Sequence, residues 1–213
     1  EQACLLRPKC VAIANPNYYQ LLKDALQGQN IDVGAGDEAI VEAAARPSDW
    51  VMAGIVGVAG LPATVTAVRR GAIIAFANKE CLVSAGNILL AEARASNANL
   101  IPVDSEHNAI FQVFESQNKD WIDKIILTAS GGPFRMSSIA DMALKTPEAA
   151  LAHPNWKMGK KISIDSATMM NKGLEIIEAH FLFAMPEDKI DVVVHPQSII
   201  HSLVAYKDGS FLA

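Results

Sequence analysis

The sequence predicts an α/β protein in two parts, a parallel doubly wound sheet followed by an α+β region with a mixed sheet. Up to about residue 104, short apolar runs alternate with helical segments of roughly 10–15 residues, the pattern of strand–helix–strand units. Beyond residue 104, late apolar runs are joined by turn residues such as Gly209, which is typical of an antiparallel or mixed sheet. We therefore expect domains at residues 1–104 and 105–213.

Capping and turn residues mark the elements of the first domain. Asn15 precedes Pro16 as a helix cap, Gly28 stops that helix, and Pro62 opens a later helix in its first turn. The expected strands cover residues 9–14, 50–56, 72–77 and 99–103, and the expected helices cover 15–27, 36–45, a segment from 62, and 83–96.

The second domain mixes short helices with strands. We expect helices at residues 106–116, 139–144, 147–151 and 169–183, and strands at 122–128, 190–194, 199–206 and from 211. The segment 163–168 is expected to be extended or irregular.

Composition excludes several classes of protein. The chain has 213 residues, 51% of them hydrophobic and 19% charged, which is the balance of a globular protein. A net charge of −5 without blocks of like charge argues against nucleic acid as a partner. No apolar run approaches the ~20 residues that a membrane span needs, so we expect no membrane partner. Three scattered cysteines suggest free thiols in a reducing compartment.

Three acids form a candidate metal site. Asp104 and Glu106 follow the strand at 99–103, and side chains two apart in an extended segment point the same way. Glu175 shares a helix face with Asn171, beside Lys172. An all-oxygen set without paired His or Cys favours Mg²⁺ or Mn²⁺ over Zn²⁺. The alternative is that all three acids are solvated surface charges.

Two neighbouring features suit an anionic ligand. Ser130-Gly-Gly follows a strand, where small residues let backbone N–H groups approach an anion, and the side chains of Ser166, Asn171 and Lys172 would complete a phosphate grip. A tight turn with a capped helix explains the same residues. The loop from His153, with Trp156 and Met158, fits either a lid or a surface loop whose Trp156 docks onto the core.

Other segments carry weaker signals. The Gly54–Gly60 segment fits a dinucleotide phosphate loop, but close helix packing produces the same letters. Asn78-Lys79-Glu80, again at a strand end, is the better candidate for touching a cofactor and a substrate together. His195 and His201 flank strand ends and suit a structural role better than a catalytic one.

Taken together, these motifs resemble the 1-deoxy-D-xylulose 5-phosphate reductoisomerase family over essentially the whole chain. The blocks that carry the resemblance are Ala77-Asn-Lys-Glu80, Pro102-Val-Asp-Ser-Glu-His-Asn-Ala-Ile-Phe111, Ser130-Gly-Gly-Pro-Phe-Arg135, His153-Pro-Asn-Trp156, Ile164-Asp-Ser-Ala-Thr-Met-Met-Asn-Lys-Gly-Leu-Glu175, His195-Pro-Gln-Ser198 and Ile200-His-Ser202. The resemblance implies an NADPH-dependent, Mg²⁺- or Mn²⁺-dependent enzyme that rearranges and reduces deoxyxylulose phosphate to 2-C-methylerythritol 4-phosphate in non-mevalonate isoprenoid biosynthesis.

The resemblance also implies a role for each motif residue. The implied metal ligands are Asp104, Glu106 and Glu175; the implied catalytic residues are Lys79, Glu106, His153 and Glu175; the substrate would also contact Ser105, Ser130, Ser166, Asn171 and Lys172; NADPH would contact Asn78, Glu80 and Gly159; and Trp156 with Met158 would form the lid. The substrate is thus expected to be a phosphorylated sugar.

The match covers the middle of the family's sequence. The chain resembles the later half of a Rossmann-like NADPH domain plus the catalytic domain, without the glycine-rich NADPH phosphate loop or the C-terminal helical domain. We therefore expect the isolated chain to bind metal and turn over poorly. The family also implies a homodimer, formed through the sheet near residues 195–206, and a bacterial cytoplasmic location, with a plastid-type organelle as the alternative.

Two other functional hypotheses stay open. One is a different metal-assisted NAD(P) oxidoreductase that acts on a phosphorylated sugar. The other is a fragment that only binds a metal and an anion.

Overall fold

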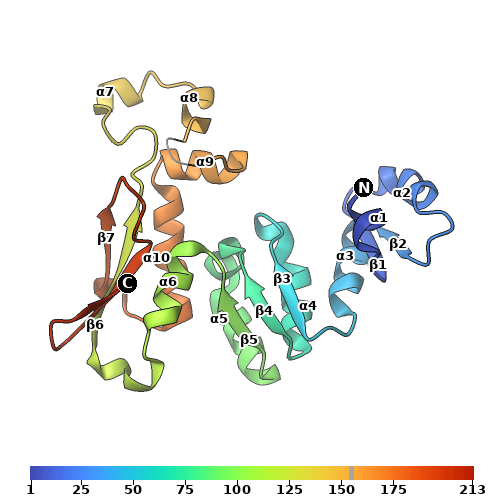
Figure 1. The fold of residues 1–213 in the computed structure, drawn as a ribbon, viewed down its shortest axis with the longest axis horizontal. Coiled ribbons are helices and arrows are strands. Elements are labelled where there is room, and N and C mark those ends of the chain that lie inside the picture. Colours follow the sequence, from blue (N-terminus) through green and yellow to red (C-terminus); the bar gives the residue numbers. More distant parts are fainter. Residues whose placement is uncertain (154–155) are drawn as a thin grey trace. The chain divides into compact units, whose positions relative to one another are not determined.

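A computed structural model describes residues 1–153 and 156–213. Internal contacts divide the chain into two compact units, residues 1–81 with 88–100, and residues 82–87 with 101–213. The ribbon in Figure 1 follows their elements from the N-terminus in blue to the C-terminus in red. The assignment of residues 1–104 to a cofactor domain and 105–213 to a catalytic domain stays a prediction.

The first unit is built from parallel strand pairs with helices between them. Strand β1 (Cys10–Ile13) pairs in parallel with β2 (Asp32–Ala35), and β3 (Trp50–Ala53) pairs in parallel with β4 (Ile73–Phe76). Strand β5 (Asn99–Pro102) follows β4 in a three-stranded sheet of order β3-β4-β5. This parallel pairing confirms the doubly wound pattern of the sequence.

The helices of the first unit begin close to where the caps place them. The Asn15 side chain accepts a hydrogen bond from Asn17 N at 3.0 Å, and Pro62 lies in the first turn of its helix. The helices are α1 (Gln2–Leu6), α2 (Tyr19–Ala25), α3 (Gly36–Ala45), α4 (Leu61–Arg69) and α5 (Lys79–Ser96), with 3-10 turns at Pro16–Tyr18 and Val58–Gly60. Strand β2 and helix α1 were not expected.

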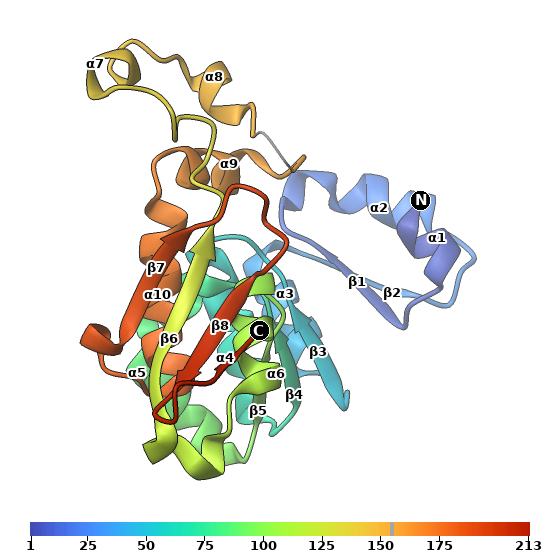
Figure 2. The ribbon, with the colours of Figure 1, turned by 60° about the vertical axis from the view of Figure 1, so that its left-hand side comes forward.

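A mixed four-stranded sheet organises the second unit. Its order is β7-β6-β8-β9, with β6 (Ile122–Ala129) parallel to β7 (Ile190–Val194) and antiparallel to β8 (Ser202–Tyr206), which pairs with β9 (Phe211–Leu212). Figure 2 shows β7, β6 and β8 side by side. The mixed sheet confirms the expected change of architecture in the second half.

The sheet and two helices enclose the hydrophobic core of the second unit. Helix α6 (Ser105–Val113) packs on β6 and β8, and α10 (Met170–Phe183) packs on β6 and β7. The buried side chains between them are Ile110, Ile122, Ile125, Leu127, Ala179, Phe183, Met185, Ile190 and Val204. Burying each large aliphatic side chain stabilises by roughly 1.5–3 kcal/mol, so this core fixes the two helices against each other.

Helix α9 (Lys160–Ala167) corrects one expectation. Residues 163–168 were expected to be extended or irregular, but residues 163–167 lie inside this helix. Contacts with α8 (Pro147–Leu151) and α10 outweigh the weak helix propensity of the serines and isoleucines. The Ser163 hydroxyl also donates to Gly159 O at 2.9 Å, so it is satisfied within the helix.

The remaining elements of the second unit are short. Helix α7 covers Ile139–Met142, and 3-10 turns cover Ser116–Trp121 and Glu187–Lys189. Met169 has a left-handed conformation, φ 61°, and separates α9 from α10. Within the described residues, no helix is both long enough and apolar enough to span a bilayer.

The turn after β6 depends on glycine at position 132. Gly132 has φ +67°, and an added Cβ would lie 2.5 Å from the carbonyl oxygen of Ser166. A left-handed conformation costs an L-residue about 1–2 kcal/mol before any clash is counted. We expect Gly132→Ala to lower the free energy of unfolding by at least that amount, measured by chemical denaturation.

Gly173 in α10 is the matched control for that substitution. An added Cβ there would meet only Met170 Sδ at 3.8 Å, so Gly173→Ala should stabilise the helix by about 0.5–1 kcal/mol. Equal effects at the two positions would contradict the conformational argument.

Candidate metal and anion site

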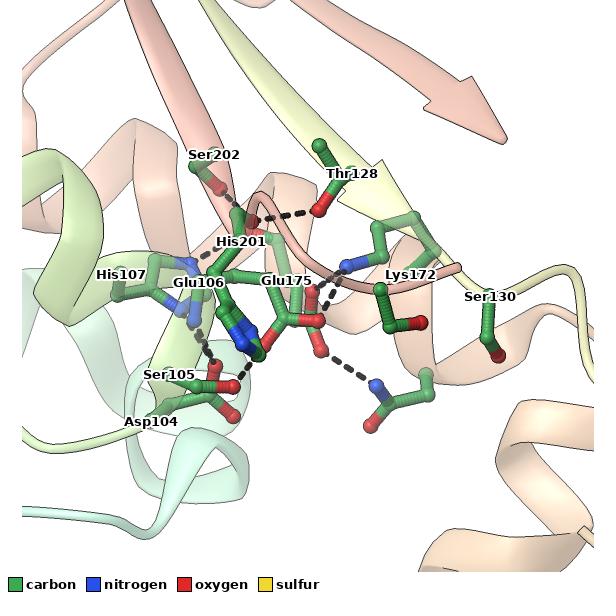
Figure 3. Close-up of polar contacts among 12 residues, drawn as sticks. Asp104, Ser105, Glu106, His107, Thr128, Ser130, Lys172, Glu175, His201 and Ser202 are labelled. Carbon is green, nitrogen blue, oxygen red and sulfur yellow. Dashed lines mark hydrogen bonds and ion pairs between the residues drawn. The ribbon is translucent and has the colours of Figure 1, made fainter. Parts of the chain in front are cut away.

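Three carboxylates of the second unit meet at one point. One oxygen from each of Asp104, Glu106 and Glu175 lies within 4.8 Å of the others. Their side chains are 14%, 21% and 1% exposed, respectively. Figure 3 shows the Asp104 and Glu106 side chains directed toward Glu175, which comes from a separate helix. The three acids are therefore not solvated surface charges.

Asp104 and Glu106 point toward the same place for a different reason than the one we expected. We expected Asp104 and Glu106 to point together because the segment would be extended, but helix α6 begins at Ser105. Asp104 is the N-cap of α6 and accepts a hydrogen bond from Glu106 N at 3.3 Å. Both acids thus lie at a helix N-terminus, where the macrodipole favours negative charge.

One lysine balances part of the negative charge. Lys172 Nζ lies 3.2 Å from Glu106 Oε1 and also donates to Glu175 Oε2, as Figure 3 shows. The Asn171 amide donates to the other Glu175 oxygen, and the Ser105 hydroxyl donates to Glu106 Oε2 at 2.7 Å. Burial, and then the charge of Glu175, raise the pKa of Glu106. The close, buried negative charges of the cluster are therefore electrostatically unfavourable, and a bound cation would stabilise them.

A buried histidine lies behind the cluster. His107 Nε2 is 3.0 Å from the Glu175 carbonyl oxygen, and its Nδ1 is 3.4 Å from Asp104 Oδ1 and 3.3 Å from Glu178 Oε2. A carbonyl oxygen only accepts, so Nε2 carries a hydrogen, and Nδ1 faces two carboxylates. Burial lowers the pKa of His107, but the hydrogen bond with Asp104 and the charge of Glu178 raise it overall to about 9.

The sequence did not assign a role to His107 or Glu178. His107 stands three residues after Asp104, and Glu178 three residues after Glu175, so helical spacing places each on the same face as a candidate ligand. This helical spacing could have indicated, from the sequence alone, that His107 and Glu178 lie beside the candidate ligands.

A cavity joins the carboxylates to the expected anion grip. It has a volume of about 380 Å³ and belongs wholly to the second unit. Its lining includes the three carboxylates and, among the expected residues, Ser105, Ser130, His153, Trp156, Met158, Ser166, Asn171 and Lys172. The structure therefore brings together the metal, substrate and lid residues that separate motifs predicted.

The hydroxyl group of Ser130 lines this cavity and can donate a hydrogen bond there. Trp156 N donates to His153 Nδ1 at 3.0 Å, so His153 Nε2 carries the hydrogen and donates to Ser130 Oγ at 3.1 Å. Gly132 N also donates to Ser130 Oγ, at 3.2 Å. Burial, and then the charge of Arg135, lower the pKa of His153 and favour this neutral form. Because the Ser130 oxygen accepts these two hydrogen bonds, its own hydrogen is available to donate to another group.

The residues of the expected lid and the two late histidines lie in different surroundings. Trp156 and Met158 line the cavity, while Gly159 is the N-cap of α9 and an added Cβ there would contact nothing within 4 Å. Pro154 and Asn155 of the same motif lie outside the described residues. His195 Nε2 accepts from Ile199 N at 3.1 Å, which is a structural role, whereas His201 lines the cavity.

Two of the three expected cofactor residues, Asn78 and Glu80, belong to the first unit, as does Lys79. Asn78 is buried, and its amide donates to Ile55 O and to Gly57 O, the latter at 2.9 Å. It therefore fixes the turn that includes Gly57. Lys79 is buried and Glu80 is half-buried, both at the start of α5. No cavity-lining residue comes from this unit, so the roles of Asn78, Lys79 and Glu80 stay predictions.

Glu175→Gln tests the carboxylate cluster directly. The substitution removes one charged ligand and keeps the side chain's shape, so we expect Mn²⁺ affinity to fall at least tenfold, of the order seen for perturbed metal shells. Titration calorimetry measures the affinity. Glu187→Gln, in an exposed 3-10 turn, is the matched control and should leave it unchanged. Equal Mn²⁺ affinity in the wild-type and Glu175→Gln proteins would exclude a three-carboxylate site.

Family models and known structures agree on what the chain is similar to. A model described as 1-deoxy-D-xylulose 5-phosphate reductoisomerase matches residues 1–86, and a model of that enzyme's C-terminal domain matches residues 100–183. The chain is 61% identical over 212 residues to the reductoisomerase of Rhodospirillum centenum, covering 100% of this chain and 53% of the relative. It is 58% identical to that of Zymomonas mobilis, covering 96% and 53%.

Two solved structures show the same similarity. The Zymomonas mobilis reductoisomerase in complex with NADPH aligns with a TM-score of 0.91 and 54% identity, over 99% of this chain and 54% of that one. A reductoisomerase in complex with NADPH, fosmidomycin and magnesium aligns with a TM-score of 0.95 and 44% identity, over 100% and 55%. The chain spans about half the length of the relatives it matches.

Proposed function

We propose, on the premise that this chain belongs to the 1-deoxy-D-xylulose 5-phosphate reductoisomerase family, that it supplies the metal and substrate site of such an enzyme. The reaction would be the NADPH-dependent rearrangement and reduction of 1-deoxy-D-xylulose 5-phosphate to 2-C-methylerythritol 4-phosphate, a step of non-mevalonate isoprenoid biosynthesis. The observation that carries this proposal is a single cavity lined by three clustered carboxylates and by a set of phosphate-binding side chains.

The donor set fits a hard divalent cation. Asp104, Glu106 and Glu175 would hold Mg²⁺ or Mn²⁺ through oxygen alone, and their mutual repulsion is reduced when a cation binds. When bound, the ion would supply Lewis-acid polarisation of a substrate carbonyl. Relatives solved with magnesium support this assignment.

The protein groups around that point would bind and orient the substrate. Ser130 would donate its own hydrogen to a phosphate oxygen, and Ser166, Asn171 and Lys172 would complete the grip. Ser105 would contact the sugar backbone beside Glu106. A structural relative solved with the phosphonate substrate analogue fosmidomycin supports an anion in such a site.

Two further groups of residues would complete the reaction. Trp156 and Met158 line the cavity and would exclude water from it, which strengthens every electrostatic contact inside. Asn78, Glu80 and Gly159 would contact NADPH, and Lys79 would contact the substrate. The relative solved with NADPH supports the choice of cofactor.

The direct test is a coupled assay on the full-length protein that contains this chain. NADPH absorbance is followed with deoxyxylulose phosphate and Mn²⁺, and we expect substrate-dependent oxidation. Oxidation only with another sugar phosphate would support a different metal-assisted oxidoreductase. Mn²⁺ and phosphate binding without any oxidation would support a fragment that only binds a metal and an anion.

Lys172→Ala separates the lysine's two possible contacts. Lys172 contacts Glu106 and Glu175 in the structure, and a bound dication would replace it there as their counter-charge. The ammonium group would then be available to a phosphate. We expect the KM for deoxyxylulose phosphate to rise at least tenfold, because the phosphate loses a charged hydrogen-bond donor. Mn²⁺ affinity should be kept, because the substitution removes a cation that competes for the same carboxylates.

Lys160→Ala, at the exposed start of α9, is the matched control for that kinetic measurement. An unaltered KM in Lys172→Ala would argue against a phosphate role, and a large loss of Mn²⁺ affinity would argue against replacement by the metal.

We also propose a homodimer in the bacterial cytoplasm. Support for the dimer is the exposed apolar surface of the edge strand β7 and the following loop, including Val193 and Ile199. Support for the location is the bacterial origin of the relatives. Light scattering of the purified full-length protein measures the first, and cell fractionation the second.

A further inference from the structure

Glu178 is a fully buried carboxylate to which the proposed reaction gives no role. It lies on α10, three residues after the candidate ligand Glu175, and its side chain is 0% exposed. Phe183 and Ala179 of the hydrophobic core lie on the same helix. Burying an ionised carboxylate is costly, and a well-packed apolar residue of similar volume often stabilises a fold as much or more. Packing alone therefore does not explain a glutamate here.

The position of Glu178 relative to His107 does explain it. Glu178 Oε2 lies 3.3 Å from His107 Nδ1, and the same nitrogen lies 3.4 Å from Asp104 Oδ1. His107 Nε2 reaches the Glu175 carbonyl oxygen at 3.0 Å. The imidazole ring therefore touches one candidate ligand through its carboxylate and another through its backbone, and Glu178 is the second acid at its Nδ1.

We propose that Glu178 is a positioning residue that acts through His107 to keep the Asp104 carboxylate oriented for a divalent cation. The proposal rests on the metal site of the proposed function. His107 Nδ1 is hydrogen-bonded to Asp104 Oδ1, and Glu178 Oε2 lies 3.3 Å from the same nitrogen, so the two acids hold the imidazole between them.

Removing the Glu178 carboxylate removes a close contact at His107 Nδ1. The imidazole ring is then held by its hydrogen bonds to Asp104 and to the Glu175 carbonyl oxygen, and it can turn about them and take the Asp104 carboxylate with it. A turned Asp104 carboxylate is a poorer ligand, so metal affinity falls.

Glu178→Gln in the purified protein is the first test. We expect Mn²⁺ affinity, measured by calorimetry, to fall about 10–100-fold, as for other residues that orient metal ligands. The electron paramagnetic resonance spectrum of bound Mn²⁺ should also change, because a turned ligand alters the ion's symmetry. Glu187→Gln, an exposed acid, should change neither quantity. Wild-type affinity with a wild-type spectrum in Glu178→Gln would overturn the proposal.

A double-mutant cycle with His107→Gln distinguishes positioning from simple attraction between charges. If Glu178 acts through His107, Glu178→Gln should have little further effect on Mn²⁺ affinity in the His107→Gln background. A full additive loss in that background would overturn the proposal, because a long-range charge effect does not need the imidazole.

If Glu178→Gln does not fold, the substitution Glu178→Asp provides a second test. Glu178→Asp keeps the charge but withdraws it from His107, and we expect a smaller but measurable loss of Mn²⁺ affinity with an altered spectrum. Wild-type values would again overturn the proposal. The wild-type protein reports separately on the proposed function: absence of Mn²⁺ binding there removes both ideas, and absence of turnover with normal Mn²⁺ binding leaves the Glu178 comparison intact.

Discussion

The candidate site of the second unit depends on balancing the repulsion among three clustered carboxylates. Asp104, Glu106 and Glu175 present oxygens within 4.8 Å of one another, and Glu175 is almost completely buried. Like charges held this close need cations nearby, and low local dielectric strengthens the repulsion. Lys172 in front and His107 behind supply that compensation.

The fold holds these groups with rigid elements. Asp104 caps α6, and Glu106 lies in its first turn, while Glu175 lies in the middle of α10. A shared hydrophobic core fixes both helices against the mixed sheet, and His107 joins them by a buried hydrogen bond to the Glu175 carbonyl oxygen. Sites on packed helices keep their geometry better than sites on loops. The anion grip, by contrast, uses the glycine turn after β6 and the residues around α9.

Sequence patterns predicted the architecture of the chain better than they predicted its local geometry. Alternating apolar runs and capping residues gave the parallel sheets and the extent of α3 and α8, because those signals are local. Residues 163–167 were misread because contacts with α8 and α10 decide their conformation. Strand β2 was missed because its four residues, Asp32–Ala35, include aspartate and glycine, which strands disfavour.

The candidate site shows the same division. Asp104, Glu106 and Glu175 were named correctly as a cluster, but the reason given for the first two was an extended segment where the structure has a helix N-terminus. The contact between Lys172 and Glu106 and the contact between Glu178 and His107 join residues 66 and 71 positions apart, respectively. No local pattern encodes such contacts, because they exist only after α6 and α10 pack together.

Anomalous X-ray diffraction from crystals grown with Mn²⁺ tests the central claim most directly. We predict one strong anomalous peak among the Asp104, Glu106 and Glu175 carboxylates, about 2.1–2.3 Å from one oxygen of each, by analogy with other hard divalent cations, and Lys172 displaced from Glu175. A peak bound elsewhere, or none at this cluster under saturating Mn²⁺, would contradict the account.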